Sequence, residues 1–458
     1  MSSLFNVLGI ARDALMVQQA GIDVTGQNIA NATTPGYVRR DAVVETRGIT
    51  AANGGAVFTG TSRQLDTFAF GRLVDEEGRK GEANARADAL ATIESLIGPA
   101  ASNLGTRIDD LFSSFQTLAA TPSDISARRA VLSKAQSLVE AFGALSGGLS
   151  NAQAELAKQA AARAEAVNAS LAEMASLNGR ISQAQALGQD ANDLRDRRDV
   201  LVRQLGQTVG ARAIEDDKGE VTVFAAGIAL VTGTQASSLD VSVSSTGSLA
   251  VRATRPGGSV VDVTAGVTEG ELGGLVRARE QDAPAAISAV DDLAFEIANA
   301  VNAVHASGFG LDAVSGRNLF EVPASATGAA YALRVSADVA GQPERLAAAA
   351  SGADVPGGSD TAIALAALAT GSLPSGASPS DGWAKITSDL GTRLASAKSE
   401  SALRTDTVSQ AETLHASASG VSLDEENVKL TQYQRAFEAS TRVLQTVDQL
   451  LDGLMKSL

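Results

Sequence analysis

Cysteine is absent from the 458 residues of this chain, and aromatic residues make up only 3% of them. Without cysteine the chain can form no disulfide, no thiolate nucleophile and no zinc site with cysteine ligands. Histidine occurs only at His305 and His415, and neither has a second histidine four residues away, so a metal site or a catalytic triad has no support. The abundance of Ala, Ser and Gly favours long thin helices over one large globular core.

Basic residues are too few to balance the acidic ones. Lys and Arg number 37 against 52 Asp and Glu, which gives a formal net charge of −15. A nucleic-acid-binding surface must neutralise phosphates, so this balance argues against a nucleic-acid partner. The glycine-rich segments contain no Gly-Lys-Ser or Gly-Lys-Thr of a phosphate-binding loop. Adjacent carboxylates such as Asp291 and Asp292 fall on different faces of a helix and are interpreted as ordinary surface charge.

Long hydrophobic runs are missing as well. No stretch approaches the length of about eighteen apolar residues that a membrane span needs, so we expect no membrane insertion. The first residues lack a basic segment, and charged and amide side chains interrupt the apolar residues after them, which does not fit a classical signal peptide. Export by another route stays open. Together these absences predict a protein that is not an enzyme and binds no cofactor.

The chain begins with a long amphipathic helix that stops abruptly at residues 31–40, NATTPGYVRR. Pro35 removes a backbone donor and pushes the preceding residue out of the helical region, so the helix should end near Asn31 to Thr33. Pro35 followed by Gly36 is the chemistry of a type II turn, which presents Tyr37 just after the bend. Along the helix two series recur every seven residues: the stronger is Leu8, Leu15, Ile22 and Ile29, and the weaker is Leu4, Ala11, Gln18 and Thr25.

Residues 422–458 carry the strongest pattern in the sequence. Ser422 and Glu425 have the spacing of a capping box, and no helix breaker follows until Gly453. A helix of this length measures about 55 Å, and no single small core would cover it. The seam therefore needs a partner helix. Its positions alternate three and four apart without a slip: Leu430, Tyr433, Phe437, Ser440, Leu444, Val447, Leu451, Leu454 and Leu458.

The N-terminal helix, which has its own seam, is the first candidate partner, and the terminal helices of neighbouring molecules are the second. The alternative is a helical hairpin that merely closes a monomer. The position of both seams at the extreme ends of the chain, where chains usually fray, favours assembly. The sequence thus predicts an assembly interface along both terminal helices, including the turn residues Asn31, Pro35, Gly36 and Tyr37.

The interior is first helical. Residues 80–205 contain few helix breakers, and we expect one helix to start at Ser123, another to span about 149–187 and a third to open at Asn192. The third begins with the charged run NDLRDRRDVLVRQL. This run permits an ion pair between Asp193 and Arg197, or is simply a solvated helix face.

The pattern then changes to β and back. Alternating β-branched residues and glycine turns predict strands from about 209 to 268. Helical periodicity returns over residues 272–306 and again from about Trp383 to His415. Between these helices, residues 307–382 are rich in Gly, Ala, Ser and Pro and are predicted to be irregular.

Both ends of the chain resemble known proteins. The opening SLFNVLGIARDALMVQQAGIDVTGQNIANATTPGYVRR resembles the N-terminal segment shared by bacterial flagellar rod, hook and hook-associated proteins, whose Ala-Asn-x-x-Thr-Pro-Gly-Tyr signature stands at residues 30–37. The closing SGVSLDEENVKLTQYQRAFEASTRVLQTVDQLLDGL resembles the C-terminal segment of the same family. Interior segments, among them PSDISARRAVLSKAQSLVEAF and VNAVHASGFGLDAVSGRNLF, resemble the hook-associated members. The resemblance covers residues 1 to about 320 and 383–458.

The resemblance implies a structural protein of the flagellum at the junction between hook and filament, which polymerises through its terminal helices and enables filament assembly. Another axial protein, a hook or rod component, is the alternative, although those members turn β-rich soon after the N-terminal motif. Implied partners are neighbouring subunits, the hook protein below, and a second junction protein and the flagellin filament above. An export chaperone would bind the C-terminal helix, with the apolar stripe from Leu444 to Leu458 lying in a groove of the chaperone. The implied location is extracellular, after export through the flagellar type III channel.

The expected fold is therefore mainly α with an inserted β domain, an α+β multidomain chain. The resemblance implies that the terminal helices pair as a coiled-coil-like inner-tube domain, with a helical bundle next and a β-rich domain outside. The expected boundaries are 1–36 with 421–458 for the terminal domain, 37–208 with 272–306 and 383–420 for the bundle, 209–271 for the β-rich outer domain, and 307–382 for an irregular Gly/Ala-rich insert packed with the outer region.

Overall fold

The computed structural model describes residues 2–46, 55–98, 104–216 and 219–457. Long helices dominate these ranges, and several small antiparallel sheets accompany them. The helices are α1 (Ser2–Ala30), α2 (Thr67–Ile97), α4 (Leu104–Ala120), α5 (Ile125–Ala186), α6 (Asn192–Val209), α7 (Gly270–Arg277), α8 (Ala283–Ser307), α9 (Ala329–Ala332), α10 (Asp360–Ala367), α11 (Pro379–Ser419) and α12 (Leu423–Ser457). The strands are β1 (Arg40–Thr46), β2 (Ala56–Arg63), β3 (Arg212–Glu215), β4 (Val221–Ala225), β5 (Ile228–Thr232), β6 (Gln235–Ala236), β7 (Ser238–Val243), β8 (Leu249–Thr254), β9 (Val260–Asp262), β10 (Phe320–Glu321) and β11 (Arg334–Val335).

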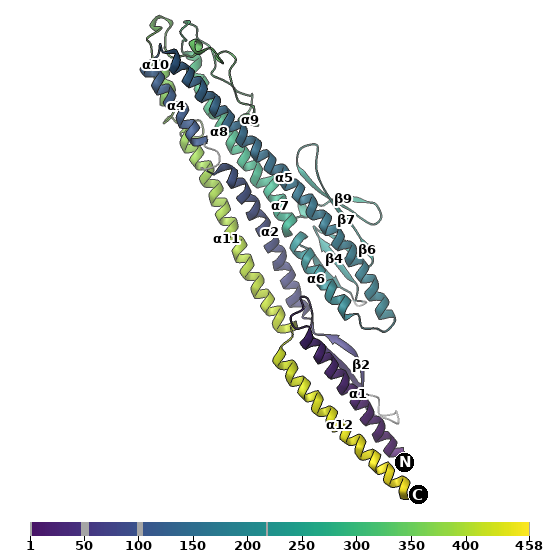
Figure 1. Ribbon diagram of the computed structural model, residues 1–458. Helices are drawn as coiled ribbons and strands as arrows, with labels where there is room; N and C mark the ends of the chain where they lie inside the picture. Colours follow the sequence, from purple (N-terminus) through teal and green to yellow (C-terminus); the bar gives the residue numbers. More distant parts are fainter. Residues whose placement is uncertain (1, 47–54, 99–103, 217–218, 458) are drawn as a thin grey trace.

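The molecule is elongated, and the two ends of the chain lie together at one extremity (Figure 1). There α1 and α12 pack side by side, and the hairpin of β1 and β2 packs against α1. The predicted pairing of the terminal helices is thus confirmed. The hairpin, which the sequence assigned to the helical bundle, packs with the terminal pair instead.

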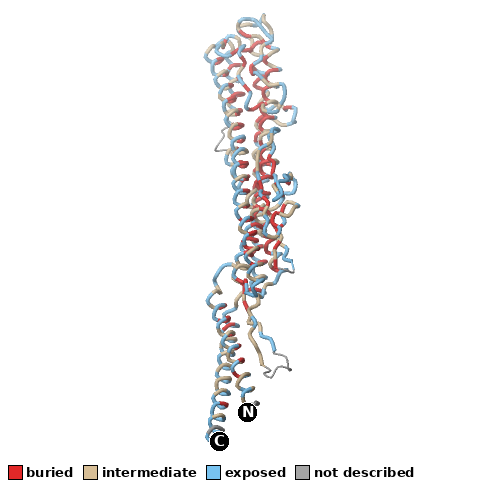
Figure 2. Tube along the Cα trace, turned by 90° about the vertical axis from the view of Figure 1, so that its right-hand side faces the viewer, coloured by how far each residue is buried: buried red, intermediate tan, exposed pale blue. Residues whose placement is uncertain are grey.

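A helical bundle continues from this pair towards the opposite tip. Its core contains buried side chains of α2, α4, α5, α8 and α11, among them Leu90, Phe115 and Phe142. Figure 2 shows that buried residues follow the bundle, whereas the terminal pair is mostly exposed or half-buried. The bundle therefore has a continuous core of its own.

The longest element of the bundle corrects a sequence prediction. Instead of separate helices starting at Ser123 and near residue 149, α5 is one helix of 62 residues, with Asp124 as its N-cap, or about 93 Å at the usual rise. The glycines at 147 and 148 do not break it, because Leu145 and Leu149 on either side are buried in the core.

Two antiparallel sheets pack against the C-terminal half of α5. Their strand orders are β3-β4-β5-β6 and β7-β8-β9. The alternating pattern had predicted strands in this segment. Valines such as Val223 and Val251 are buried in one core with apolar side chains of α5 and α6. Amides of α5 fasten the sheets: Asn178 Nδ2 donates to the carbonyl of Val221 over 2.8 Å, and Asn168 exchanges hydrogen bonds with the backbone of Leu239.

The sequence predicted that residues 307–382 pack with the β-rich outer region. In the structure this segment packs elsewhere. Its buried side chains, which include Phe320, Leu333 and Leu346, share the core of α4, α5 and α8 at the tip far from the termini. Buried polar groups of α8 hold its irregular backbone. Asn302 accepts from the amides of Leu319 and Phe320 and donates to the Phe320 carbonyl.

Two further side chains of α8 act in the same way. Asp291 accepts from the amides of Gly328 and Ala330 over 2.7 and 3.0 Å, so it is not the surface charge that its acidic neighbour suggested. His305 is buried, its Nδ1 lies 2.7 Å from the Arg317 carbonyl, and its Nε2 accepts from the Ala347 amide over 3.0 Å. The proton therefore sits on Nδ1. Burial, with the nearby arginine charges, lowers the pKa of His305 below its usual range.

We expect this tip to loosen in acid because of His305. The unfolded segment binds a proton near pH 6.5, whereas the folded form stays neutral until a lower pH. The stability contributed by neutral His305 is therefore present above that value and is lost as the pH falls towards the lowered pKa. Hydrogen exchange of the Ala347 amide, corrected for its intrinsic pH dependence, should accelerate between about pH 7 and pH 5.

The amide of Leu319 serves as the internal control, since it donates to the Asn302 side chain, which does not titrate. Its protection should change less than that of Ala347 over the same range. Equal protection of the Ala347 amide at both pH values would contradict the role assigned to His305.

Candidate functional site

The two terminal helices run antiparallel in one defined register. A Cβ on Gly21 of α1 would lie 2.5 Å from the ring of Tyr433 on α12, so the ring rests against the bare backbone. Asn28, seven residues further along α1, contacts Glu426, seven residues earlier on α12. Small and medium side chains of α1 are buried beside these contacts, including Ala11, Val17 and Val24.

The predicted seam of α12 coincides with its less exposed stripe. Val447 is buried, and six further members are half-buried. Leu454 also lies in α12, whereas Leu458 lies outside the described residues. The half-buried members are Leu430, Tyr433, Phe437, Ser440, Leu444 and Leu451.

The predicted seam of α1 behaves differently. The weaker series contains the buried Ala11 and Thr25, because small side chains let α12 approach closely. The stronger series is only half-buried and thus remains accessible in a single chain. It consists of Leu8, Leu15, Ile22 and Ile29, and Leu4 at the start of the helix is half-buried too.

The turn after α1 has the predicted form. The amide of Tyr37 donates to the carbonyl of Thr34 over 3.2 Å, and Gly36 has a φ of +80°, as the third residue of a type II turn requires. Asn31 supports the end of the helix: its Nδ2 donates to the carbonyl of Gln27 and its Oδ1 accepts from the hydroxyl of Thr34.

Replacing Gly36 with alanine should destabilise the protein for two separable reasons. The positive φ alone costs about 1–2 kcal/mol for a residue with a Cβ. The new methyl would also collide with Cγ2 of Val200 on α6. Urea denaturation should therefore show a larger loss for Gly36→Ala than for Gly188→Ala, which has a φ of +67° with open space around it.

Combining Gly36→Ala with Val200→Ala should restore part of the lost stability, since the colliding group is then gone. Equal losses for Gly36→Ala and Gly188→Ala would mean that the contact between the turn and α6 contributes nothing.

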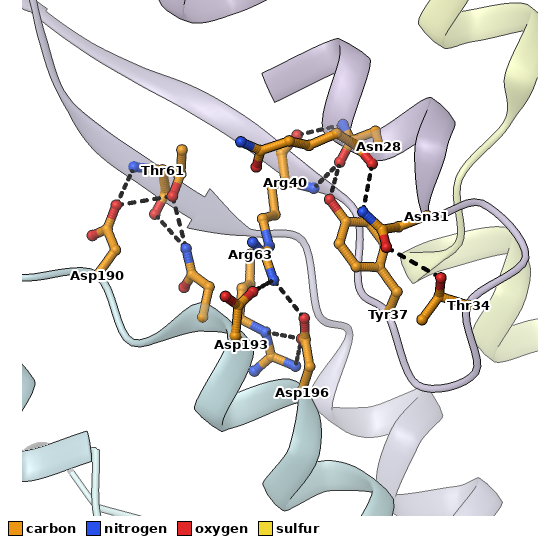
Figure 3. A network of polar contacts seen from close by, with 12 residues as sticks. Asn28, Asn31, Thr34, Tyr37, Arg40, Thr61, Arg63, Asp190, Asp193 and Asp196 are labelled. Atoms are coloured by element: carbon orange, nitrogen blue, oxygen red, sulfur yellow. Dashed lines mark hydrogen bonds and ion pairs between the residues drawn. The ribbon is translucent and has the colours of Figure 1, made fainter. Parts of the chain in front are cut away.

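Asn28 is the centre of a polar cluster beside the turn (Figure 3). Its Nδ2 donates to the Arg40 carbonyl over 2.8 Å and to Glu426 Oε2 over 2.9 Å. Its Oδ1 accepts from the Arg40 amide over 3.0 Å and from the Tyr37 hydroxyl over 2.8 Å. All four hydrogen-bonding positions of the amide are occupied, so Asn28 ties α1, the turn and α12 together.

Two arginines next to the turn connect the terminal pair to the bundle. Arg40 Nη2 donates to Asp193 Oδ1 over 2.6 Å and to Asp196 Oδ2 over 2.7 Å, both on α6. Arg63, at the end of β2, donates from Nε to Asp196 Oδ1 over 2.8 Å and from Nη2 to Asp199. Asp196 therefore bridges both arginines, and Figure 3 shows them converging on it.

The electrostatics of this bridge follow from its partial burial. Burial lowers the pKa of Arg40, but the hydrogen bonds to Asp193 and Asp196 outweigh it, so the net shift is upward. Burial raises the pKa of Asp199, and the charge of Arg63 opposes the rise. Burial likewise raises the pKa of Tyr37, whose ring lies 4.9 Å from the Arg40 guanidinium.

Further contacts join α12 to the same junction. Arg39 Nη1 donates to Glu425 over 2.9 Å, and Lys429 Nζ donates to Asp41 over 2.6 Å. The capping box predicted at Ser422 is only half formed. The Glu425 amide lies 3.5 Å from the Ser422 hydroxyl, which is the first half of the motif. The Glu425 carboxylate, which would form the second half, pairs with Arg39 instead. The break between α11 and α12 is thereby fixed to the turn that follows α1.

Two further possibilities for the described residues are a metal site and a membrane-spanning helix. Across them, no group of three or more His, Cys, Asp or Glu side chains is placed to hold a metal ion. Nor does any helix there combine the length and apolar character needed to cross a membrane. The polar junction and the apolar terminal pair are thus the features that a function has to explain.

Comparison with known sequences identifies the family. Residues 90–320, half of the chain, match the family described as the flagellar hook-associated protein FlgK helical domain. The chain belongs to the flagellar hook-associated protein FlgK family. Its ends match two further flagellar families: residues 8–37 match the flagella basal body rod protein, and residues 415–456 match the C-terminal region of the flagellar basal body rod FlgEFG protein.

Full-length relatives agree with the FlgK assignment. Flagellar hook-associated protein 1 of Escherichia coli K12 is 27% identical over 553 aligned positions, which cover 99% of this chain and all of the relative. The protein of the same name from Bacillus subtilis is 27% identical over 100% of this chain and 99% of its own length. Since the first alignment exceeds the 458 residues here, that relative has segments without a counterpart in this chain.

A solved structure is similar as well. The flagellar hook junction protein FlgK from Burkholderia pseudomallei shares 27% sequence identity and a TM-score of 0.52, over 55% of this chain and 47% of its own. Taken with the helical interior, these similarities make the chain a structural flagellar protein of the hook–filament junction. As a FlgK family member, it is part of the bacterial flagellum and assembles with neighbouring subunits into the axial structure.

Proposed function

We propose that the chain polymerises at the tip of the hook through its terminal helices and thereby enables filament assembly. The observation that carries this proposal is the half-exposed series Leu8, Leu15, Ile22 and Ile29 on α1, beside a seam already occupied by α12. A single chain leaves this apolar stripe accessible to water at four successive heptad positions, which is unfavourable unless neighbouring subunits cover it.

Other apolar side chains of the terminal pair support the same proposal. On α1, Phe5 and Met16 are 57% and 60% exposed. On α12, Val428 and Leu450 are 58% and 55% exposed. Both helices thus present apolar groups outside their mutual contact, as helices at the centre of a polymer would.

The partners follow from position along the axis. We infer contacts with the hook protein below and with a second junction protein and the flagellin filament above, in addition to neighbouring subunits. An export chaperone would take the apolar stripe of α12 in a groove, and the chain would leave the cell by the flagellar type III route to an extracellular location. We infer no nucleic-acid partner, no membrane insertion and no enzymatic activity, in keeping with the structural names of the relatives.

The domains take corresponding places in this proposal. Residues 1–36 with 421–458 form the inner tube, and the hairpin of β1 and β2 packs with them. The helices within residues 64–208, 272–306 and 383–420 form the next shell. The sheets of residues 209–271 face outward. The junction at Arg40 and Arg63 would hold the inner tube at a fixed angle to the shell.

Electron microscopy of cells lacking this gene, combined with an assay for flagellin in the medium, tests the proposal. We expect complete hooks without filaments and flagellin shed outside. Missing hooks would make the protein a hook or rod component. Normal flagella would overturn the proposal altogether.

A further inference from the structure

We propose that the body of the molecule bends at a joint near the middle of α5, where the core of the bundle meets the core of the sheets. The joint lies at the level of Gln153 on α5 and of Asp282 between α7 and α8. The proposal goes beyond the proposed function, because it concerns the two halves of the body and requires neither terminal helix.

Two separate apolar cores meet at this level. Buried side chains of α5 belong to the bundle core up to Leu149 and to the sheet core from Leu156 onward. Residues 150–155 between them are all exposed or half-buried. The next helices change over in the same way, since Ala278 packs in the sheet core and Ala283 in the bundle core. A change in the angle between the halves would therefore disrupt few apolar contacts.

The helix α2 runs through the joint and contributes to both cores over residues 87–90, and a polar contact on it holds the halves together. The Asp282 side chain is 3% exposed and accepts from Arg86 Nε on α2 over 2.9 Å and from Nη2 over 3.2 Å. Arg393 Nη1 on α11 lies 3.9 Å from the same carboxylate. A buried ion pair of this kind is costly to break, yet it fixes one point and not a surface. Asp282 thus serves as a pivot about which the helices can tilt.

The connection from α7 to α8 has a weakened backbone at the same level. The amide of Ala283 donates to the carbonyl of Ala278, five residues back instead of four. Pro284 follows and has no amide hydrogen, so the regular ladder loses a further hydrogen bond. Gln153 Nε2 on α5 donates to the Arg279 carbonyl over 3.2 Å instead. Wide turns and prolines are the positions at which helices bend.

A cavity beside the joint gives the halves room to move. It has a volume of about 600 Å³ and lies between α2 and α5, with small or polar side chains such as Ala85, Thr92 and Ala152 in its wall. From the joint at Leu156 to its end at Ala186, α5 is about 45 Å long, so a bend of about 10° moves this end by about 8 Å. The body can therefore bend without a clash between α2 and α5.

The absence of cysteine permits a direct test with spin labels on the full chain. Gln183→Cys on α5 and Ser396→Cys on α11 are exposed positions in the sheet half and the bundle half. Double electron–electron resonance should give a distance distribution for this pair that extends over about 8 Å, the displacement of the end of α5. Pairs within one half should each give a narrower distribution. They are Gln183→Cys with Gln204→Cys, and Ser396→Cys with Ser113→Cys.

Filling the cavity should stiffen the joint. Ala152→Leu with Ala162→Leu places two larger side chains in its wall, and the distribution across the joint should shrink to the width of the pairs within one half. The matched control is Ala154→Leu with Ala166→Leu, two exposed positions of the same helix that do not line the cavity. This control should leave the broad distribution unchanged.

Equal widths for all three label pairs in the unaltered chain would overturn the proposal, because the body would then be rigid. A broad distribution that persists in the filled variant would overturn it too, since the cavity would not be the space into which the halves move. If circular dichroism shows that the filled variant has lost its helices, the three pairs in the unaltered chain decide. None of these results depends on hooks or filaments, so a failure here is distinguishable from a failure of the proposed function.

Discussion

Replacing Asp196 with alanine is expected to lower the free energy of unfolding by about 3 kcal/mol, the lower end of the range for removing one partner of a buried ion pair. Asp196 accepts from both Arg40 and Arg63, and the side chains of these arginines are only 10% and 6% exposed. Without it, two largely buried guanidinium groups lose their shared acceptor. Contacts to Asp193 and Asp199 remain, which places the expected loss at the lower end. Urea denaturation followed by circular dichroism measures it.

Asp193→Ala is the matched control for this prediction. Asp193 also accepts from Arg40, but its side chain is 89% exposed against 13% for Asp196. Its loss should cost less than about 1 kcal/mol, as is usual for ion pairs in contact with water. Equal effects of Asp193→Ala and Asp196→Ala would show that the junction is not held by the buried bridge.

The second large effect concerns assembly. Leu444→Asp should stop incorporation at the hook and remove filaments from cells, while the purified chain keeps its folded bundle. Leu444 is half-buried on the seam of α12, and a carboxylate there would be enclosed without a partner once neighbouring subunits cover the pair. Because every subunit carries the change, the same unfavourable free energy arises at each subunit of the assembly. Filament counts by microscopy and circular dichroism of the monomer measure the two parts.

Gln445→Asp provides the comparison, since it adds the same charge at the next residue, which is exposed. Filaments should form normally on this variant. Normal filaments on Leu444→Asp as well would mean that the seam of α12 is not part of the assembly interface.

The ends of the chain could be predicted because their signals act over a few residues. Pro35 and Gly36 determine the stop and the turn locally, and α1 indeed ends at Ala30 with a turn over residues 34–37. Heptad spacing likewise indicated which face of α12 is least exposed. On α1, the more hydrophobic of the two heptad series is not the one buried against α12. Close approach to α12 depends on small side chains such as Ala11 and Gly21.

The polar junction could not be predicted in the same way. The charged run that opens α6 was interpreted as a pair between Asp193 and Arg197 or as a solvated face. Asp193 instead pairs with Arg40, which is 153 residues away, and Arg197 contacts Glu173. A sequence pattern reports neighbours within a helix and gives no information about partners that only the tertiary fold supplies. One signal was present: Asn28 and Glu426 continue the heptad spacing of Gly21 and Tyr433 with polar residues.

The contact between Asn28 and Glu426 also bears on the order of folding. These residues are 398 positions apart in the chain, so α1 must wait for its partner until almost all of the intervening sequence has been produced and collapsed. The bundle core also needs a late element, because side chains of α11 at residues 379–419 belong to it. A chain that ends before Glu426 cannot close the terminal pair in the observed way. Closure of that pair is therefore the last long-range contact that the chain can make, and it requires the C-terminal helix.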